Sequence, residues 1–320
     1  MISLWNFGEG IITAALTPLT SSGEVMEESI AEFIDFQIRS GIKGFFVLGT
    51  YGEGLAIHPR KRMYFLERFL NYVRDNTLII VNVSSTAPEL SLELAKHATD
   101  LGVSAISSLP PIYYAQDLGG LVKYFSLFSK IDSPVLIYNN PQRQNYDITP
   151  SIFEHLVNEV PNLKGIKDSS GSIERVHKLL NTSYVRNYFI AIANDLMVLH
   201  TFLLGGKAHI CGLSNLFPEI SHKIYTSVIN NDLKLAIELQ NILNSVREAV
   251  KEIPVDSSVV VRELMKLRGI DLGHPSPINR ELTQNEKTKV VSRVKSIIHK
   301  SSAVLEKAGI NIGDLLKLTP

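Results

Sequence analysis

The chain has 320 residues, of which 45% are hydrophobic and 20% are charged, a composition typical of a soluble globular protein with a large core. Its 32 acidic and 32 basic residues balance, so charge gives no reason to expect nucleic acid or a membrane as a partner. The one cysteine, Cys211, excludes internal disulfides and cysteine-rich zinc sites, and no histidine spacing suggests a metal. Residues 1–7 do not resemble a signal peptide and no apolar run would span a membrane, so we expect a cytoplasmic protein.

Short apolar segments alternate with longer amphipathic segments between residue 10 and about residue 230. Runs that are apolar at successive positions are typical of parallel strands covered on both faces. The fourth run is the weakest, since it contains three serines. Strands are therefore predicted at residues 10–16, 44–49, 78–83, 104–109, 134–139, 162–167, 188–193 and 208–213.

The amphipathic segments between these strands predict helices. Ile30, Phe33, Ile34 and Ile38 form an apolar stripe at three- and four-residue spacing, and Gly41 just after it is typical of a helix end. Similar start and stop signals elsewhere are Thr149 with Pro150, Ser172 and Gly102. From about residue 232 three helical patterns follow one another with no strand between them.

Eight β/α units in series predict a (β/α)8 TIM barrel, which we place at residues 1–230. Residues 231–320 are predicted to form a helical C-terminal extension packed on the barrel. An open doubly wound sheet is the alternative. It would normally have a glycine fingerprint after its first strand, and residues 16–20 contain no glycine.

Active sites of such barrels lie at the carboxyl ends of the strands, so the polar residues there are the candidates. Lys167 stands at the tip of the sixth strand. Burial there would lower the pKa of its amine and leave it able to attack a carbonyl and form a Schiff base. A lysine in this position often extends to water instead. The glycine-rich turn at residues 49–54 fits either a carboxylate cradle or a tight turn without a ligand.

Three motifs in this order resemble the dihydrodipicolinate synthase/N-acetylneuraminate lyase family of class I, pyruvate-type aldolases. They are Gly-Thr-x-Gly-Glu at 49–53, Tyr-Asn-x-Pro at 138–141 and Gly-Ile-Lys-Asp at 165–168. The resemblance covers about residues 10–300 and implies a (β/α)8 barrel with a helical C-terminal extension. It also implies a homotetramer and no cofactor.

The resemblance implies catalytic roles for four residues. Lys167 would form the Schiff base with pyruvate or another 2-keto acid, and Tyr138 would relay protons. Thr50 would couple Tyr138 to Tyr113, which crosses from a neighbouring subunit in the synthases. Thr50 and Tyr51 would also hold the pyruvate carboxylate.

Further positions are assigned to substrate binding by the same resemblance. Ile210 would turn its carbonyl to the site, and Arg143 would bind the carboxylate of an aldehyde partner. Asp195 would either contact substrate or cap the following helix. Three positions depart from the usual family pattern: Tyr51 replaces a threonine, and Asn145 and Ala193 replace glycines.

We therefore expect a Schiff-base-forming lyase whose partners are small molecules, pyruvate or a 2-keto acid together with an aldehyde. Arg143 favours a dihydrodipicolinate synthase-like condensation with a carboxylated aldehyde. A 2-keto-3-deoxygluconate-type sugar-acid aldolase and an arylidene-pyruvate hydratase-aldolase, suggested by Tyr51, are alternatives within the class. A regulator that binds a keto acid without turnover is the alternative from another class.

Overall fold

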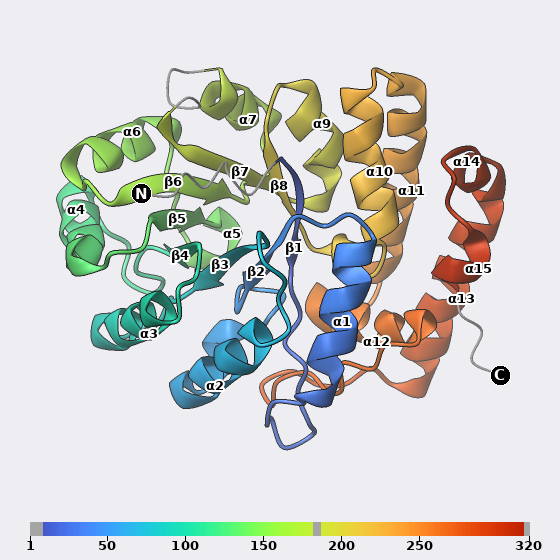
Figure 1. The fold of residues 1–320 in the computed structure, drawn as a ribbon, viewed down its shortest axis with the longest axis horizontal. Helices are drawn as coiled ribbons and strands as arrows, with labels where there is room; N and C mark the ends of the chain where they lie inside the picture. Colours follow the sequence, from blue (N-terminus) through green and yellow to red (C-terminus); the bar gives the residue numbers. More distant parts are fainter. Residues whose placement is uncertain (1–8, 182–186, 317–320) are drawn as a thin grey trace.

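A computed structural model describes residues 9–181 and 187–316 of the chain. Its centre is a closed barrel of eight parallel strands, in which neighbours in sequence pair and β1 pairs with β8 (Figure 1). The strands are β1 (Gly10–Ala14), β2 (Gly44–Val47), β3 (Leu78–Asn82), β4 (Ala105–Ser108), β5 (Val135–Asn139), β6 (Leu163–Asp168), β7 (Phe189–Ala193) and β8 (Ala208–Cys211). The predicted TIM barrel is confirmed, and only β6 extends beyond its predicted segment, by one residue. Residues 1–7, considered for a signal peptide, lie outside the described part.

Helices surround the barrel as the apolar stripes predict (Figure 1). Thr149 and Ser172 accept hydrogen bonds from the third backbone amide beyond them, as N-caps do. Gly41 has φ of 90° and Gly102 has φ of 76°, the left-handed conformation in which helices commonly end. The helices are α1 (Glu28–Arg39), α2 (Pro59–Leu70), α3 (Pro88–Asp100), α4 (Leu118–Ser126), α5 (Pro141–Gln144), α6 (Pro150–Glu159), α7 (Ile173–Leu180), α9 (Val198–Leu203) and α10 (Pro218–Ile229).

Apolar side chains form two layers because successive residues of a strand point to opposite faces of the sheet. The larger layer lies between the strands and the helices around them. The smaller one fills the barrel and includes Phe46, Tyr138, Ala193 and Ile210. These four side chains point into the barrel. Lys167 on β6 pairs with Tyr138 on β5, so its side chain points to the same face of the sheet. The barrel interior is thus a packed apolar core, with Lys167 and Tyr138 near the carboxyl ends of their strands.

The C-terminal extension contains five helices in its described part, where three were predicted: α11 (Leu233–Lys251), α12 (Ser257–Met265), α13 (Gln284–Lys300), α14 (Ser302–Lys307) and α15 (Ile312–Leu315). The two additional helices are short, and such helices carry little periodic signal in sequence. α11 packs along α10 and against α13, so the extension lies on one side of the barrel (Figure 1). The junction of α11 and α12 reaches the cavity at the carboxyl ends of the strands.

A buried ion pair ties the extension to the turn after β2. Arg262 and Glu53 are 2% and 7% exposed, and Nη2 of Arg262 lies 2.8 Å from Oε1 of Glu53. The other oxygen of Glu53 accepts hydrogen bonds from the amide and hydroxyl of Ser276 and from the Asn279 amide group. Arg262 also donates to the carbonyls of Thr17 and Leu272. Both charges are therefore compensated, as burial demands.

None of the helices within residues 9–181 and 187–316 combines the length and apolar character that crossing a membrane requires.

Candidate active site

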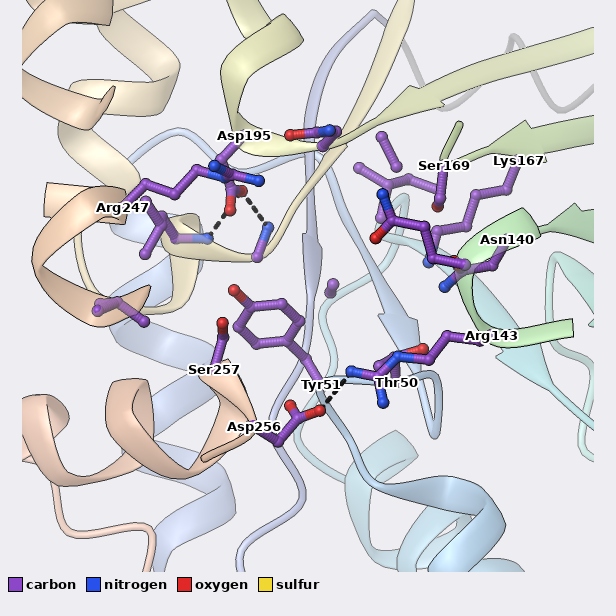
Figure 2. A pocket seen from close by; sticks show the side chains of 18 of the residues that line it. Thr50, Tyr51, Asn140, Arg143, Lys167, Ser169, Asp195, Arg247, Asp256 and Ser257 are labelled. Atoms are coloured by element: carbon purple, nitrogen blue, oxygen red, sulfur yellow. Dashed lines mark hydrogen bonds and ion pairs between the residues drawn. The ribbon is translucent and has the colours of Figure 1, made fainter. Parts of the chain in front are cut away.

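A cavity of about 210 Å³ lies at the carboxyl ends of the strands, and the α11–α12 junction forms part of its wall (Figure 2). Seven of the eight residues predicted for the site line it: Thr50, Tyr51, Tyr138, Arg143, Lys167, Asp195 and Ile210. They come from the ends of five different strands or from the loops that follow, so only closure of the barrel brings them together.

Lys167 lies next to the end of β6 with its amine enclosed by aromatic rings. It is 3% exposed, and Nζ lies 3.7 Å from the ring centroid of Phe46 and 3.9 Å from that of Tyr138. Burial lowers the pKa of Lys167, and Tyr138 opposes this shift only in part. The side chain does not extend to bulk water, and its environment favours the neutral, nucleophilic amine.

Tyr138, on β5, presents its hydroxyl to the same space. This hydroxyl lies 2.8 Å from Oγ1 of Thr50 and accepts a hydrogen bond from the Asn140 amide group at 3.2 Å. Burial alone would raise the pKa of Tyr138, but the Lys167 charge and the hydrogen bonds from Thr50 and Asn140 outweigh it, so the pKa is lowered. A phenol that releases its proton more readily than usual therefore lies beside a lysine that holds its proton less tightly.

The glycine-rich turn that carries Thr50 packs closely against the backbone that follows β1 and β2. A Cβ atom on Gly54 would lie 1.9 Å from the carbonyl oxygen of Leu48, and one on Gly52 would lie 2.9 Å from that of Ala15. Both glycines are therefore explained by close packing of the turn, with no ligand involved. What the turn contributes to the cavity is the pair of side chains Thr50 and Tyr51.

Tyr51 occupies space that Gly212, after β8, leaves open. A Cβ atom on Gly212 would lie 2.4 Å from two ring carbons of Tyr51, so this bulky residue depends on the glycine opposite it. Burial and the nearby Asp195 charge raise the pKa of the Tyr51 hydroxyl well above its usual value. The hydroxyl therefore stays protonated and can donate a hydrogen bond within the cavity.

Asp195 and Ile210 line the cavity at the ends of β7 and β8. Oδ1 of Asp195 accepts hydrogen bonds from the backbone amides of Gly212 at 2.8 Å and Leu213 at 3.1 Å. Its neighbour Asn194, not Asp195, caps the following turn by accepting from the Leu196 amide. Asp195 thus shapes the turn after β8, and Ile210 is a buried member of the barrel interior.

Arg143 lies at the rim, with 57% of its side chain exposed, and forms an ion pair with Asp256. Asp256 in turn caps α12 by accepting from the Ser258 amide. The guanidinium therefore already has a carboxylate partner from the extension. Asn145, where the family pattern has glycine, adopts φ of 64°, which asparagine tolerates better than most residues, so the backbone turn is retained.

Tyr113 does not line this cavity. Its side chain is 83% exposed on the loop after β4, next to Tyr114, which is 73% exposed. The role of Tyr113 in the site of a neighbouring subunit stays a prediction, as does the homotetramer. Exposure of two adjacent tyrosines is compatible with it, because large aromatic side chains are enriched where protein surfaces meet.

The sequence alone did not point to the residues that the extension contributes. Arg247 from α11, and Asp256 and Ser257 at the start of α12, line the cavity (Figure 2). Lys251 from α11 lines it too. On the sequence, Arg247 is one of many charged positions on the polar side of a helix. The four-residue spacing of Arg247 and Lys251, which puts both on one helical face, is the only signal that marks them. Within the described residues, no group of three His, Cys, Asp or Glu side chains is arranged to hold a metal ion.

Fold and site together define a TIM-barrel protein whose strand-end cavity encloses a buried lysine beside a hydrogen-bonded tyrosine. The profile of the dihydrodipicolinate synthetase family matches residues 8–300, and the chain belongs to this family. It is accordingly an enzyme of the lyase class, of the aldolase type.

Similar proteins agree with this assignment. The chain is 29% identical over 284 residues to the 4-hydroxy-tetrahydrodipicolinate synthase of Lachnoclostridium phytofermentans, covering 87% of this chain and 92% of that one. It is 29% identical over 233 residues to a probable 2-dehydro-3-deoxy-D-pentonate aldolase of Escherichia coli, covering 72% and 77%. The sialic acid aldolase of Ruminococcus gnavus, solved as a catalytic lysine mutant, has the same fold, with a TM-score of 0.87, 22% identity and coverage of 95% and 100%.

Proposed function

We propose that this protein forms or cleaves a carbon–carbon bond next to a Schiff base between Lys167 and pyruvate or another 2-keto acid. The observation that carries the proposal is the enclosure of the Lys167 amine by Phe46 and Tyr138, with the Tyr138 hydroxyl held by Thr50. An amine in this environment is poised to act as a nucleophile, and a phenol beside it is poised to move protons.

The steps follow from these groups. The neutral amine of Lys167 attacks C2 of the keto acid, and its proton passes to the carbonyl oxygen. Tyr138 gives a second proton, the oxygen leaves as water, and a protonated imine remains. The Tyr138 phenolate then takes a proton from C3 to give the enamine. The enamine attacks the aldehyde carbon, and Tyr138 returns its proton to the aldehyde oxygen, which becomes a hydroxyl. Hydrolysis of the new imine releases the product and frees Lys167; cleavage runs these steps in reverse.

The direct test is reduction with borohydride in the presence of pyruvate. We expect a mass gain localised to Lys167, and we expect Lys167→Ala to lose both the adduct and all turnover. Lys164→Met is the matched control, because Lys164 lies on the same strand but donates to the Pro161 carbonyl at an exposed position. A folded protein that gives no adduct at Lys167 would rule out the proposal.

The proposal includes two candidate reactions, which differ in the aldehyde that accepts the enamine. Condensation of pyruvate with a carboxylated aldehyde is supported by the similarity to the Lachnoclostridium synthase. A sugar-acid aldolase is favoured by the engagement of Arg143 with Asp256, and by the similarity to the Escherichia coli pentonate aldolase. Rates with pyruvate and a panel of carboxylated and hydroxylated aldehydes separate them. An adduct without turnover of any acceptor would instead indicate a keto-acid sensor.

A further inference from the structure

Arg247 is a cation of the cavity wall without a counterion. It projects from the last turn but one of α11 and is half-buried, on the side of the cavity away from Lys167 (Figure 2). Within residues 9–181 and 187–316, no hydrogen bond or ion pair engages its guanidinium. Asp195 lies nearby but forms no ion pair with it, and Oδ1 of Asp195 is already bound to two backbone amides. A half-buried guanidinium with five unused donors is a strong site for an anion.

Tyr51 adds a hydrogen-bond donor to the same place. Its hydroxyl points toward the side of the cavity where Arg247 lies (Figure 2), and burial together with the Asp195 charge raises its pKa, so it keeps its proton. In the described part of the chain, no hydrogen bond engages this hydroxyl. Lys251, one helical turn after Arg247, lines the same wall and has no ion pair there either.

The local charge balance favours an anion at this wall over one at Arg143. Asp256 neutralises Arg143, whose side chain is 57% exposed and thus strongly screened by solvent. Arg247 and Lys251 together carry two positive charges. Two carboxylates line the cavity, Asp195 and Asp256, and Asp256 is already paired with Arg143. The net charge at the α11 end is therefore positive before any substrate binds.

We infer that the acceptor carries a terminal anionic group, a carboxylate or a phosphate ester, which Arg247 binds with the help of Tyr51 and Lys251. The inference rests on the proposed function, because it places the keto acid at Lys167 and the far end of the acceptor at α11. Arg143, the residue that the sequence favours for this task, stays paired with Asp256. The C-terminal extension thereby sets which acceptors the barrel uses.

Kinetics with three acceptors test this assignment: succinic semialdehyde, glyceraldehyde 3-phosphate and neutral glyceraldehyde, each with pyruvate. Arg247→Met is expected to raise KM at least about tenfold for an anionic acceptor and to leave KM for glyceraldehyde unchanged, since hydrogen bonds to charged groups contribute that much. The first two acceptors distinguish a carboxylate from a phosphate. Arg143→Met is expected to have a smaller effect, and Arg60→Met, an exposed arginine on α2, none.

Calorimetric titration with succinate and with inorganic phosphate tests anion binding without turnover. We expect heat with the unmodified protein and with Arg60→Met, and its loss in Arg247→Met. The inference fails if neither anion binds the unmodified protein, if Arg247→Met binds as well as the unmodified protein, or if Arg143→Met alone loses binding. Borohydride trapping of pyruvate at Lys167 keeps the two proposals apart. We expect the adduct in both the unmodified protein and Arg247→Met. An absent adduct in the unmodified protein contradicts the proposed function, whereas the titration still tests the anion site independently.

Discussion

The two ends of the cavity differ in how their polar groups are engaged. At the barrel end, the hydroxyl of Tyr138 is fixed by Thr50 and Asn140, and the Lys167 amine lies between two rings. At the α11 end, Arg247 and the Tyr51 hydroxyl have no hydrogen-bond partner in the described part of the chain. Groups that react benefit from preorganisation, whereas groups that select a substrate must be left open for it. The contrast therefore assigns chemistry to the barrel and selection to the extension.

Removing the hydroxyl at the barrel end should give the largest effect. Tyr138→Phe keeps the ring over Lys167 but removes the proton carrier, so kcat should fall by about 10²–10⁴. The adduct with pyruvate should still form, because Lys167 is retained, but more slowly. Steady-state kinetics and borohydride trapping measure the two quantities. Unchanged kcat would mean that another group moves the protons, and that the hydrogen bonds of the Tyr138 hydroxyl to Thr50 and Asn140 do not serve catalysis.

Breaking the buried ion pair that ties the C-terminal extension to the turn after β2 should cost stability. Glu53→Gln leaves the Arg262 guanidinium buried without its counterion, which should lower the free energy of unfolding by about 3–5 kcal/mol. Urea unfolding measures this change. Glu174→Gln, at the exposed pair with Lys178, is the control and should have no measurable effect. Equal effects of the two substitutions would contradict a special role for the buried pair.

The pH dependence of adduct formation sharpens the description of the barrel end. Only the neutral amine attacks, so the initial rate should rise with pH and level off at a pH below the ordinary pKa of lysine, because burial lowers the pKa of Lys167. Tyr138 partly raises this pKa, so Tyr138→Phe should move the rising limb to still lower pH. If the initial rate rises around the ordinary lysine pKa in both proteins, burial does not lower the pKa of the Lys167 amine.

The smallest effect, slightly tighter binding of an anionic acceptor, is expected from a substitution at the cavity rim. Asp256→Asn removes a negative charge from the cavity rim and frees Arg143, while asparagine can still cap α12. KM for an anionic acceptor should fall about two- to fivefold, and less at high salt, as is typical of a screened surface charge. Acceptor kinetics at two salt concentrations measure it. An increase in KM would indicate that Asp256 itself holds the acceptor.

Much of the barrel end could be predicted from sequence. Apolar runs marked the eight strands, the fourth only weakly, and the position of Lys167 after such a run placed it at a strand tip. The motif around Thr50 and the turn after Tyr138 gave their partners. Tyr113 could not be placed in the same way: it lies on an exposed loop, and nothing in its own segment specifies which surface it meets.

The α11 end shows what sequence patterns do not contain. Helical periodicity placed Arg247 on a polar face, but which polar face turns to solvent and which to a cavity depends on how α11 docks across the barrel. The pairing of Arg143 with Asp256 joins residues 113 positions apart, and no local pattern encodes such a contact.

The sequence by itself determined the order of strands and helices and placed Lys167 at a strand tip, because apolar patterning and backbone propensity act over a few neighbouring residues. The pairing of Lys167 with Tyr138 was implied by the family resemblance of the motifs that contain them. Tertiary structure decided which cations stay free, since that depends on charges brought together from distant segments. Closure of the barrel set Lys167 against Phe46 and Tyr138. Docking of the extension neutralised Arg143 and left Arg247 open.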